Sequence, residues 1–212
     1  MNIGIIGATG TIGQRILNEA LSRGHNVTAF AREESRIPAE KGKVTWEVAD
    51  VLDADSLAWA IGGQDVVISS YGPGQARDPQ TIVAAAHALL KAMEKHPGTR
   101  VIFVGGAGSL EVKPGLQLVD SGAIPDAYKA VVLAHRDALN VFRQAPGKKW
   151  TFFSPAGFIS PGERTGKFRL GGDQLIVGED GQSRISCEDY AVAMLDEAEK
   201  GQFIGKRFTV GY

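Results

Sequence analysis

The sequence predicts an α/β protein with a parallel, doubly wound sheet and helices on both of its faces. Short apolar runs alternate along the chain with longer segments of helical periodicity, which is typical of that class. A glycine-rich turn at residues 7–13 joins the first apolar run to the first helical segment. The 212 residues, of which 43% are hydrophobic and 22% charged, suffice for one domain with a sizeable core. We therefore expect a single domain over residues 1–212, with residues 154–212 as an elaboration on the substrate side.

The expected elements alternate along the chain. Strands are expected at residues 1–6, 25–30, 43–48, 65–70, 100–104 and 149–153, and helices at 14–23, 56–61, 80–95 and 126–143. Segments 167–170 and 174–177 are expected to pair as a hairpin, and residues 207–210 to form a last strand. Ser186 is expected to cap a helix that reaches Lys200. Right-handed crossovers between parallel strands then place any ligand at the carboxyl ends of the strands.

The turn at residues 7–13 reads Gly-Ala-Thr-Gly-Thr-Ile-Gly and is the main binding signal. Its spacing departs from Gly-x-Gly-x-x-Gly, but its place between a strand and a helix matches the pyrophosphate-binding opening of a Rossmann domain. Glycines let the backbone approach phosphates closely, and the N–H groups and dipole of the following helix attract negative charge. An ordinary strand-to-helix turn is the alternative. The predicted contacts are Gly7, Thr9, Gly10, Thr11, Ile12 and Gly13.

The tip of the second strand predicts which dinucleotide binds. NAD-binding chains of this fold place a carboxylate there, whereas this chain has Arg32, whose forked guanidinium suits a 2′-phosphate. We therefore expect NADP(H); an Arg32 paired in solvent with Glu33 or Glu34 is the alternative. Asp50 and Val51, just after the third strand, are expected at the adenine edge, with a turn or capping role as the alternative for Asp50.

The tips of the central strands are expected to border the same cofactor. Small residues there permit close approach, and simple turn formation is the alternative for each of them. The predicted contacts at these tips are Ser69, Ser70, Tyr71, Gly105 and Gly106.

Tyr128 is the candidate catalytic residue, because a tyrosine at the start of its helix could donate a proton to a carbonyl that receives hydride. A packing aromatic is the alternative. The glycine-rich stretch after residue 154 is too long for a mere connector, so it is expected to border the substrate pocket. The predicted pocket walls are Ser109, Phe158, Arg164 and Phe168; Arg164 would favour an anionic substrate, and a solvated loop arginine is its alternative. The four histidines are scattered and Cys187 stands alone, so no metal site is expected.

Six segments of the chain resemble the NmrA-like, NAD(P)H-binding branch of the atypical short-chain dehydrogenase/reductase family. They are residues 7–13, 104–110, 150–156, 164–166, 185–191 and 207–212. The resemblance implies a Rossmann fold with NAD(P) at the N-terminal glycines, and with Ser154, Pro155 and Ala156 beside the nicotinamide. Catalytic members of the wider superfamily use a serine after the fifth strand and a Tyr-x-x-x-Lys pair. This chain has Gly106 at the serine position and Val132 four residues after Tyr128.

The missing proton relay favours an NADPH-dependent oxidoreductase whose acceptor is small and flat, such as a quinone or a flavin, because solvent can supply the proton to such acceptors. A redox-sensing protein that binds NADP(H) without turnover is the alternative from another class, and a sugar-nucleotide epimerase is a weaker one. A formal net charge of −1 argues against nucleic acid or a membrane as partner. One cysteine, and no leader-like segment before Ile3, predict a cytoplasmic protein.

Overall fold

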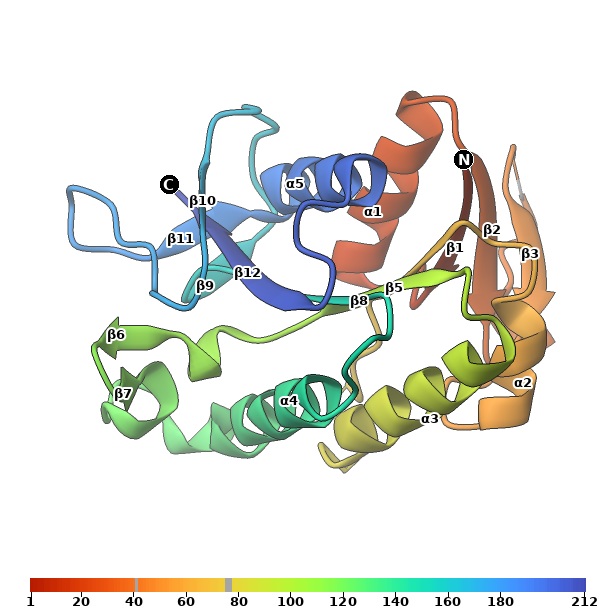
Figure 1. The fold of residues 1–212 in the computed structure, drawn as a ribbon. Coiled ribbons are helices and arrows are strands. Elements are labelled where there is room, and N and C mark those ends of the chain that lie inside the picture. Colours follow the sequence, from red (N-terminus) through yellow and green to blue (C-terminus); the bar gives the residue numbers. More distant parts are fainter. Residues whose placement is uncertain (41, 75–77) are drawn as a thin grey trace.

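The computed structural model describes residues 1–40, 42–74 and 78–212. Within these residues, eight strands form one sheet in the order β10-β12-β8-β5-β4-β1-β2-β3 (Figure 1). The strands are β1 (Asn2–Ile6), β2 (Asn26–Ala31), β3 (Thr45–Val48), β4 (Val66–Ser69), β5 (Arg100–Val104), β8 (Trp150–Ser154), β10 (Arg169–Gly171) and β12 (Lys206–Gly211). Neighbours pair in parallel except at β10, which runs antiparallel to β12. The predicted fold class is confirmed.

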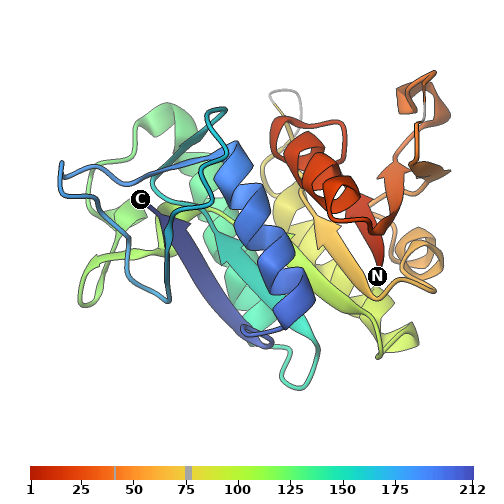
Figure 2. The same cartoon turned by 90° about the horizontal axis from the view of Figure 1, so that it is seen from above.

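The longer helices cover both faces of the sheet (Figure 1, Figure 2). α1 (Thr11–Ser22) and α5 (Cys187–Lys200) pack together on one face, and α2 (Ala54–Ala60), α3 (Thr81–Lys95) and α4 (Asp126–Arg143) cover the other. Phe103 and Phe152 point from the strands into the core beneath α3 and α4. On the opposite face Phe153 stacks between Tyr190 and Phe208, with ring centroids 4.1 and 3.9 Å apart. Because both faces are covered, the strands read as nearly continuous apolar runs.

The predicted hairpin between residues 167–170 and 174–177 is wrong. Leu170 instead pairs with Val210, so that β10 completes the edge of the main sheet beside β12. The chain then turns to bring the Asp173 carboxylate to Arg207, whose Nε donates to Oδ1 at 2.8 Å. Arg207 is 8% exposed, and a buried guanidinium needs such a partner. A local hairpin would not supply this partner, so the long-range pairing prevails.

The shortest elements have no counterpart in the sequence-based expectations. They are β6 (Glu111–Lys113), β7 (Leu116–Gln117), β9 (Phe158–Ser160), β11 (Arg184–Ser186), and the 3-10 turns η1 (Glu34–Arg36), η2 (Ala107–Ser109) and η3 (Leu118–Asp120). Segments of two or three residues are too short to show periodicity. The cap on α5 is confirmed, because the Ser186 hydroxyl accepts the Asp189 N–H at 2.9 Å.

The direction of strand order changes between β1 and β4. From β1 the chain builds outward through β2 and β3, whereas β4 is followed on its other side by β5, β8 and β12. In open sheets of this type the ligand crevice lies beyond the carboxyl ends of the strands, at such a switch point. The fold therefore directs attention to the loops that follow β1 and β4.

Candidate functional site

A groove of about 770 Å³ opens at this switch point. Most of the predicted cofactor contacts line it, and they come from the turn after β1 and from the tips of β2, β3 and β4. These residues are Gly7, Thr9, Gly10, Thr11, Ile12, Gly13, Arg32, Asp50, Val51, Ser70 and Tyr71. The groove also has lining residues that the sequence reading missed, namely Ile6, Phe30, Ala31, Arg36, Ala49, Gly72, Pro73 and Gly74. Half of the missed residues directly adjoin a predicted one, and all but Arg36 lie within three positions of one, so a wider window around each strand tip would have found most of them.

The turn after β1 leaves no room for side chains at two of its glycines. Gly7 has a φ of 78°, and a Cβ there would lie 2.7 Å from the Ser70 carbonyl oxygen. A Cβ on Gly13 would lie 2.0 Å from the Gly7 carbonyl oxygen. The Ser70 hydroxyl donates to the Ile6 carbonyl at 2.8 Å and thereby ties the end of β4 to the end of β1. The backbone of this turn thus lines the groove, and the Ser70 hydrogen bond holds it against the end of β4.

The start of α1 is suited to an anion. The helix begins at Thr11, and its N-cap residue, Gly10, has no side chain that could accept hydrogen bonds from the first turn. Residues 11–14 carry no acidic group, so nothing in that turn neutralises the positive end of the helix dipole. Free N–H groups, a glycine cradle and an uncompensated dipole match the pyrophosphate of a dinucleotide. The residues present therefore fit the cofactor that the motif implies.

Two arginines lie at the other end of the groove. Arg32 is half-buried at the tip of β2, and its Nε donates to a Glu33 carboxylate oxygen at 2.8 Å. This guanidinium lowers the pKa of Glu33. Arg36, in η1, lines the same groove, with its Nε 4.0 Å from the Glu33 carboxylate. The pairing with Glu33 matches the alternative foreseen for Arg32, yet both guanidinium groups remain beside the groove.

Asp50 takes the turn role that was its alternative. Its carboxylate accepts the Leu52 N–H at 3.0 Å, and its own N–H donates to the Ser56 hydroxyl at 3.1 Å. It lines the groove at the same time. The turn geometry therefore holds Asp50 beside the groove without using its whole carboxylate, and its contact with the adenine stays a prediction.

The glycines after β5 pack closely against neighbouring side chains. A Cβ on Gly105 would lie 2.0 Å from the Phe152 ring, and a Cβ on Gly106 would lie 3.0 Å from the His135 Cβ. The small residues after β5 thus make room for neighbouring side chains. Ser69, Ser154, Pro155 and Ala156 are likewise buried, and they do not lie among the groove-lining residues. The contact of Ser154, Pro155 and Ala156 with the nicotinamide, and that of Ser69 and the two glycines with the cofactor, stay predictions.

The predicted acceptor-side residues are dispersed. Tyr128 lies in the first turn of α4 and Phe158 in β9, with 62% and 65% of each residue exposed. Phe168 packs against the core under α1 and α5. Ser109 is buried, and its hydroxyl accepts a hydrogen bond from Arg207 Nη1 at 3.3 Å. The hydroxyl of Ser109 is therefore already engaged within the protein.

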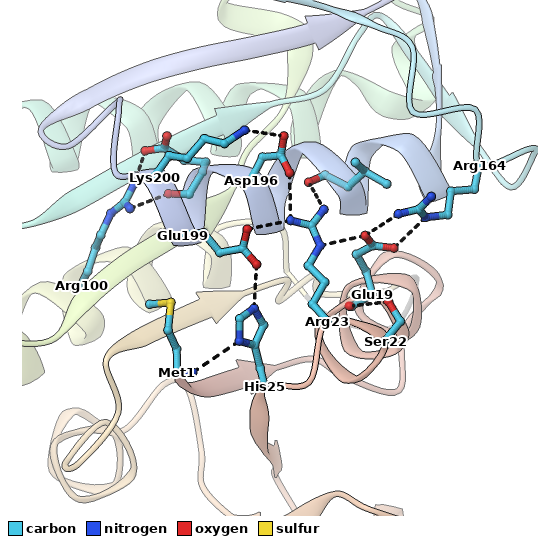
Figure 3. Close-up of polar contacts among 12 residues, drawn as sticks. Met1, Glu19, Ser22, Arg23, His25, Arg100, Arg164, Asp196, Glu199 and Lys200 are labelled. Atoms are coloured by element: carbon cyan, nitrogen blue, oxygen red, sulfur yellow. Dashed lines mark hydrogen bonds and ion pairs between the residues drawn. The ribbon is translucent and has the colours of Figure 1, made fainter.

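Arg164 does not lie among the groove-lining residues and is paired with a carboxylate on α1. Its Nε and Nη2 both donate to the Glu19 carboxylate on α1, each at 2.8 Å (Figure 3). Glu19 is only 6% exposed and also accepts from Arg23 Nε at 2.9 Å. The hydrogen bond from Arg164 is the largest cause of the lowered pKa of Glu19. A buried carboxylate needs compensating charge, and Arg164 supplies part of it. The role of Arg164 as a wall of the substrate pocket stays a prediction.

The next two residues of the same segment are held by a second buried carboxylate. Asp189, on α5, accepts from the Gly166 N–H at 2.7 Å and from the Thr165 hydroxyl at 2.5 Å. It also accepts from the Tyr212 hydroxyl at 2.8 Å. We call residues 164–166 the strap, because they fasten the loop after β9 onto α1 and α5.

Among the residues that the structure describes, no group of three or more histidine, cysteine, aspartate or glutamate side chains is placed to hold a metal ion. No helix in the described ranges is long and apolar enough to cross a membrane.

Known proteins resemble this chain along its whole length. It is 38% identical to protein YwnB of Bacillus subtilis (strain 168), over 99% of this chain and 98% of that protein. A solved protein from Burkholderia pseudomallei, named as a candidate exported protein, is 51% identical, with a TM-score of 0.91 and 100% of both chains covered. One from Streptococcus pneumoniae TIGR4, named as a candidate NADH-flavin reductase, is 33% identical, with a TM-score of 0.86 over 100% of this chain and 99% of that one.

A family model described as NAD(P)H-binding matches residues 7–198. The match includes the glycine turn, both arginines of the groove, the strap and most of α5. It agrees with the fit between the start of α1 and a dinucleotide pyrophosphate. The chain therefore belongs to the NAD(P)H-binding family of Rossmann-fold oxidoreductases.

Proposed function

We propose that the protein is an NADPH-dependent oxidoreductase that reduces a small, flat acceptor such as a quinone or a flavin. The observation that carries the cofactor choice is the pair of guanidinium groups, Arg32 and Arg36, at the adenosine end of the groove. When bound, the dinucleotide supplies a hydride. The chain supplies the N–H groups of the first turn of α1 for the pyrophosphate and the two arginines for a 2′-phosphate.

We base the choice of acceptor on the missing lysine of the Tyr-x-x-x-Lys proton relay. Val132 stands where a relay lysine would be, and Lys129 lies 4.0 Å from Asp126 on the exposed side of α4. After a quinone or a flavin has accepted hydride, water can supply the proton that completes its reduction, so such acceptors need no protein acid. Cys187 is a buried free thiol, which fits a reducing compartment, and a cytoplasmic location is part of this proposal.

A redox-sensing role without turnover is the second candidate. It is favoured by the packing of His135 against Gly106, because a serine at residue 106 would crowd the imidazole. This packing removes one part of the superfamily's usual proton relay. A sensor would keep the cofactor groove and lack an acceptor site.

The first experiment measures binding and turnover together. We expect calorimetry to give a tighter Kd for NADP⁺ than for NAD⁺, and we expect NADPH oxidation with 1,4-naphthoquinone or riboflavin. The Streptococcus relative is named for NADH, so NADH is the competing donor in both assays. Equal affinity for the two dinucleotides would remove the case for NADPH. Tight binding without turnover on any acceptor would favour the sensor.

A further inference from the structure

His135 lies on the face of α4 that covers the loop after β5. Its side chain contacts Gly106, where a Cβ would meet the His135 Cβ, Cγ and Cδ2 at 3.0, 3.1 and 3.3 Å. Val132, one turn earlier, occupies the corresponding position against Gly108, where a Cβ would lie 2.0 Å from Val132 Cγ1. The backbone of residues 106–108 therefore lies directly on α4, and the imidazole is located at the carboxyl end of β5.

The imidazole is short of hydrogen-bond partners. Its Nδ1 is buried and has none among the described residues. Burial lowers the pKa of His135 to about 4, so the ring is neutral at neutral pH. A neutral imidazole carries one hydrogen, and a buried N–H without an acceptor costs more than a bare ring nitrogen. We therefore place the hydrogen on Nε2, at the far side of the ring from the backbone.

A second orphaned group lies on the neighbouring strand. The Ser154 hydroxyl, at the end of β8, is buried and has no partner within the described ranges. It lies two residues after Phe152 along the strand, so it faces the α4 side of the sheet, as Phe152 does. β8 pairs directly with β5, so Ser154 and the His135 side chain both lie at the carboxyl end of this strand pair. Buried polar groups are rarely left unpaired, and those that are call for a ligand, water or ion.

The cofactor groove is next to this place. β4 pairs with β5 on the other side, with Ser69 opposite Phe103, and residues 70–74 after β4 line the groove. A ring held at the end of the groove would therefore extend over the tip of β5. We propose that His135 binds the acceptor at this position by donating a hydrogen bond from Nε2.

The inference rests on the proposed function and assigns one role within it. In the overall step the quinone gains a hydride and a solvent proton and becomes a hydroquinone, while NADPH becomes NADP⁺. Negative charge develops on a quinone oxygen before the proton arrives. A donor fixed at that oxygen stabilises the charge, and His135 retains its own hydrogen throughout. Its neutrality suits this role, because it offers an N–H without acting as an acid.

Three variants test the role by turnover. His135→Phe keeps a ring of similar size and removes the donor, and His135→Gln places an amide N–H near the position of Nε2. His87→Gln, at an exposed position of α3, is the matched control. With 1,4-naphthoquinone we expect His135→Phe to lower kcat about tenfold or more, His135→Gln to recover most of that loss, and the control to match the wild type. The Kd for NADP⁺ should change by less than about twofold in all three, because the groove is not altered.

An unchanged kcat in His135→Phe would overturn the proposal, and so would an equal loss in the Phe and Gln variants. NMR of the wild type decides the question if a variant fails to fold. The ¹⁵N signals of the four histidine rings should show a neutral, Nε2-protonated His135 whose signal moves when naphthoquinone is added to the NADP⁺ complex. A His135 signal that does not move would overturn it. Wild-type protein that turns over no acceptor would instead remove the proposed function, while the NMR signal would still report the contact.

Discussion

The two ends of the candidate site are built in different ways. The phosphate end consists mainly of backbone, because residues 7–13 form a turn that has no room for side chains at Gly7 and Gly13 and that leads into the first turn of α1. Two of the predicted acceptor-side residues, Arg164 and Ser109, are instead held by side chains from distant parts of the sequence. Glu19 meets Arg164 across 145 positions, and Ser109 meets Arg207 across 98. Substitutions in the glycine turn should therefore change cofactor affinity, whereas substitutions in the long-range side-chain contacts should mainly change stability.

The largest expected effect is at Gly13. In Gly13→Ala the new Cβ would lie 2.0 Å from the Gly7 carbonyl oxygen, which must move and distort the cradle. We expect NADP⁺ affinity to fall more than about a hundredfold, because a misplaced turn forfeits several charge-assisted hydrogen bonds at once. Calorimetry measures the loss, and a melting curve shows how much of it is unfolding.

Gly10→Ala is the control within the same turn. Its Cβ would approach the Gly7 carbonyl oxygen to only 3.3 Å, and Gly10 has a φ of −77°, which alanine adopts readily. We expect a loss of affinity well below that of Gly13→Ala. Equal losses in the two variants would contradict the view that backbone shape governs the phosphate end.

Arg32 comes second. Arg32→Asp removes a charge-assisted contact to a 2′-phosphate and adds a carboxylate that suits a free ribose hydroxyl. We expect NADP⁺ binding to weaken by about 1.5–3 kcal/mol, enough to reverse the preference for NADP⁺ over NAD⁺. Competition calorimetry with both dinucleotides measures the change.

Arg36→Gln tests how much Arg36 contributes, beside Arg32, to the preference for NADP⁺ over NAD⁺. Arg36 lines the groove beside Arg32 but is more exposed. We therefore expect the same direction with a smaller loss. An unchanged preference in Arg32→Asp would transfer the specificity to Arg36 or remove the 2′-phosphate site altogether.

The same contrast explains what could be predicted from the sequence. The parallel sheet and most of the phosphate end were predictable, because apolar runs and residues 7–13 carry their information within a few neighbouring positions. The role of Arg164 was not, because it depends on Glu19, a residue on another element. The hairpin failed for the same reason: the partner of β10 is β12, which lies about 40 positions later in the sequence. Arg36 is an intermediate case. The sequence places it close to Arg32 along the chain, but it does not show that Arg36 faces the groove.

Glu19→Gln tests the strap and should produce a moderate effect on stability. The two arginines lower the pKa of Glu19 from its ordinary 4.5, so its charged form is favoured in the folded state. That contribution is fully present above pH 4.5 and is lost as the pH falls through the lower folded pKa. We expect the variant to be less stable than the wild type by about 1–3 kcal/mol at pH 7. The difference should shrink below pH 4.5 in urea titrations.

Glu94→Gln is the matched control for the strap. Glu94 pairs with Lys148 at 3.1 Å, but its side chain is 65% exposed, and exposed pairs contribute about 0–1 kcal/mol. NADP⁺ affinity should be the same in both variants, because the phosphate end depends on backbone. A Glu19→Gln variant with wild-type stability at pH 7 would show that the strap is held by Asp189 alone.

Tyr128→Phe should give the smallest effect. Tyr128 is 62% exposed in the first turn of α4, and Val132, rather than a lysine, follows it by one helical turn. Nothing there is arranged to make its hydroxyl an efficient acid, and a quinone or flavin acceptor does not require one. We expect kcat to fall by less than about tenfold, short of the ~10²–10⁴ typical for loss of a general acid. A thousandfold fall with unchanged NADP⁺ affinity would make Tyr128 the proton donor.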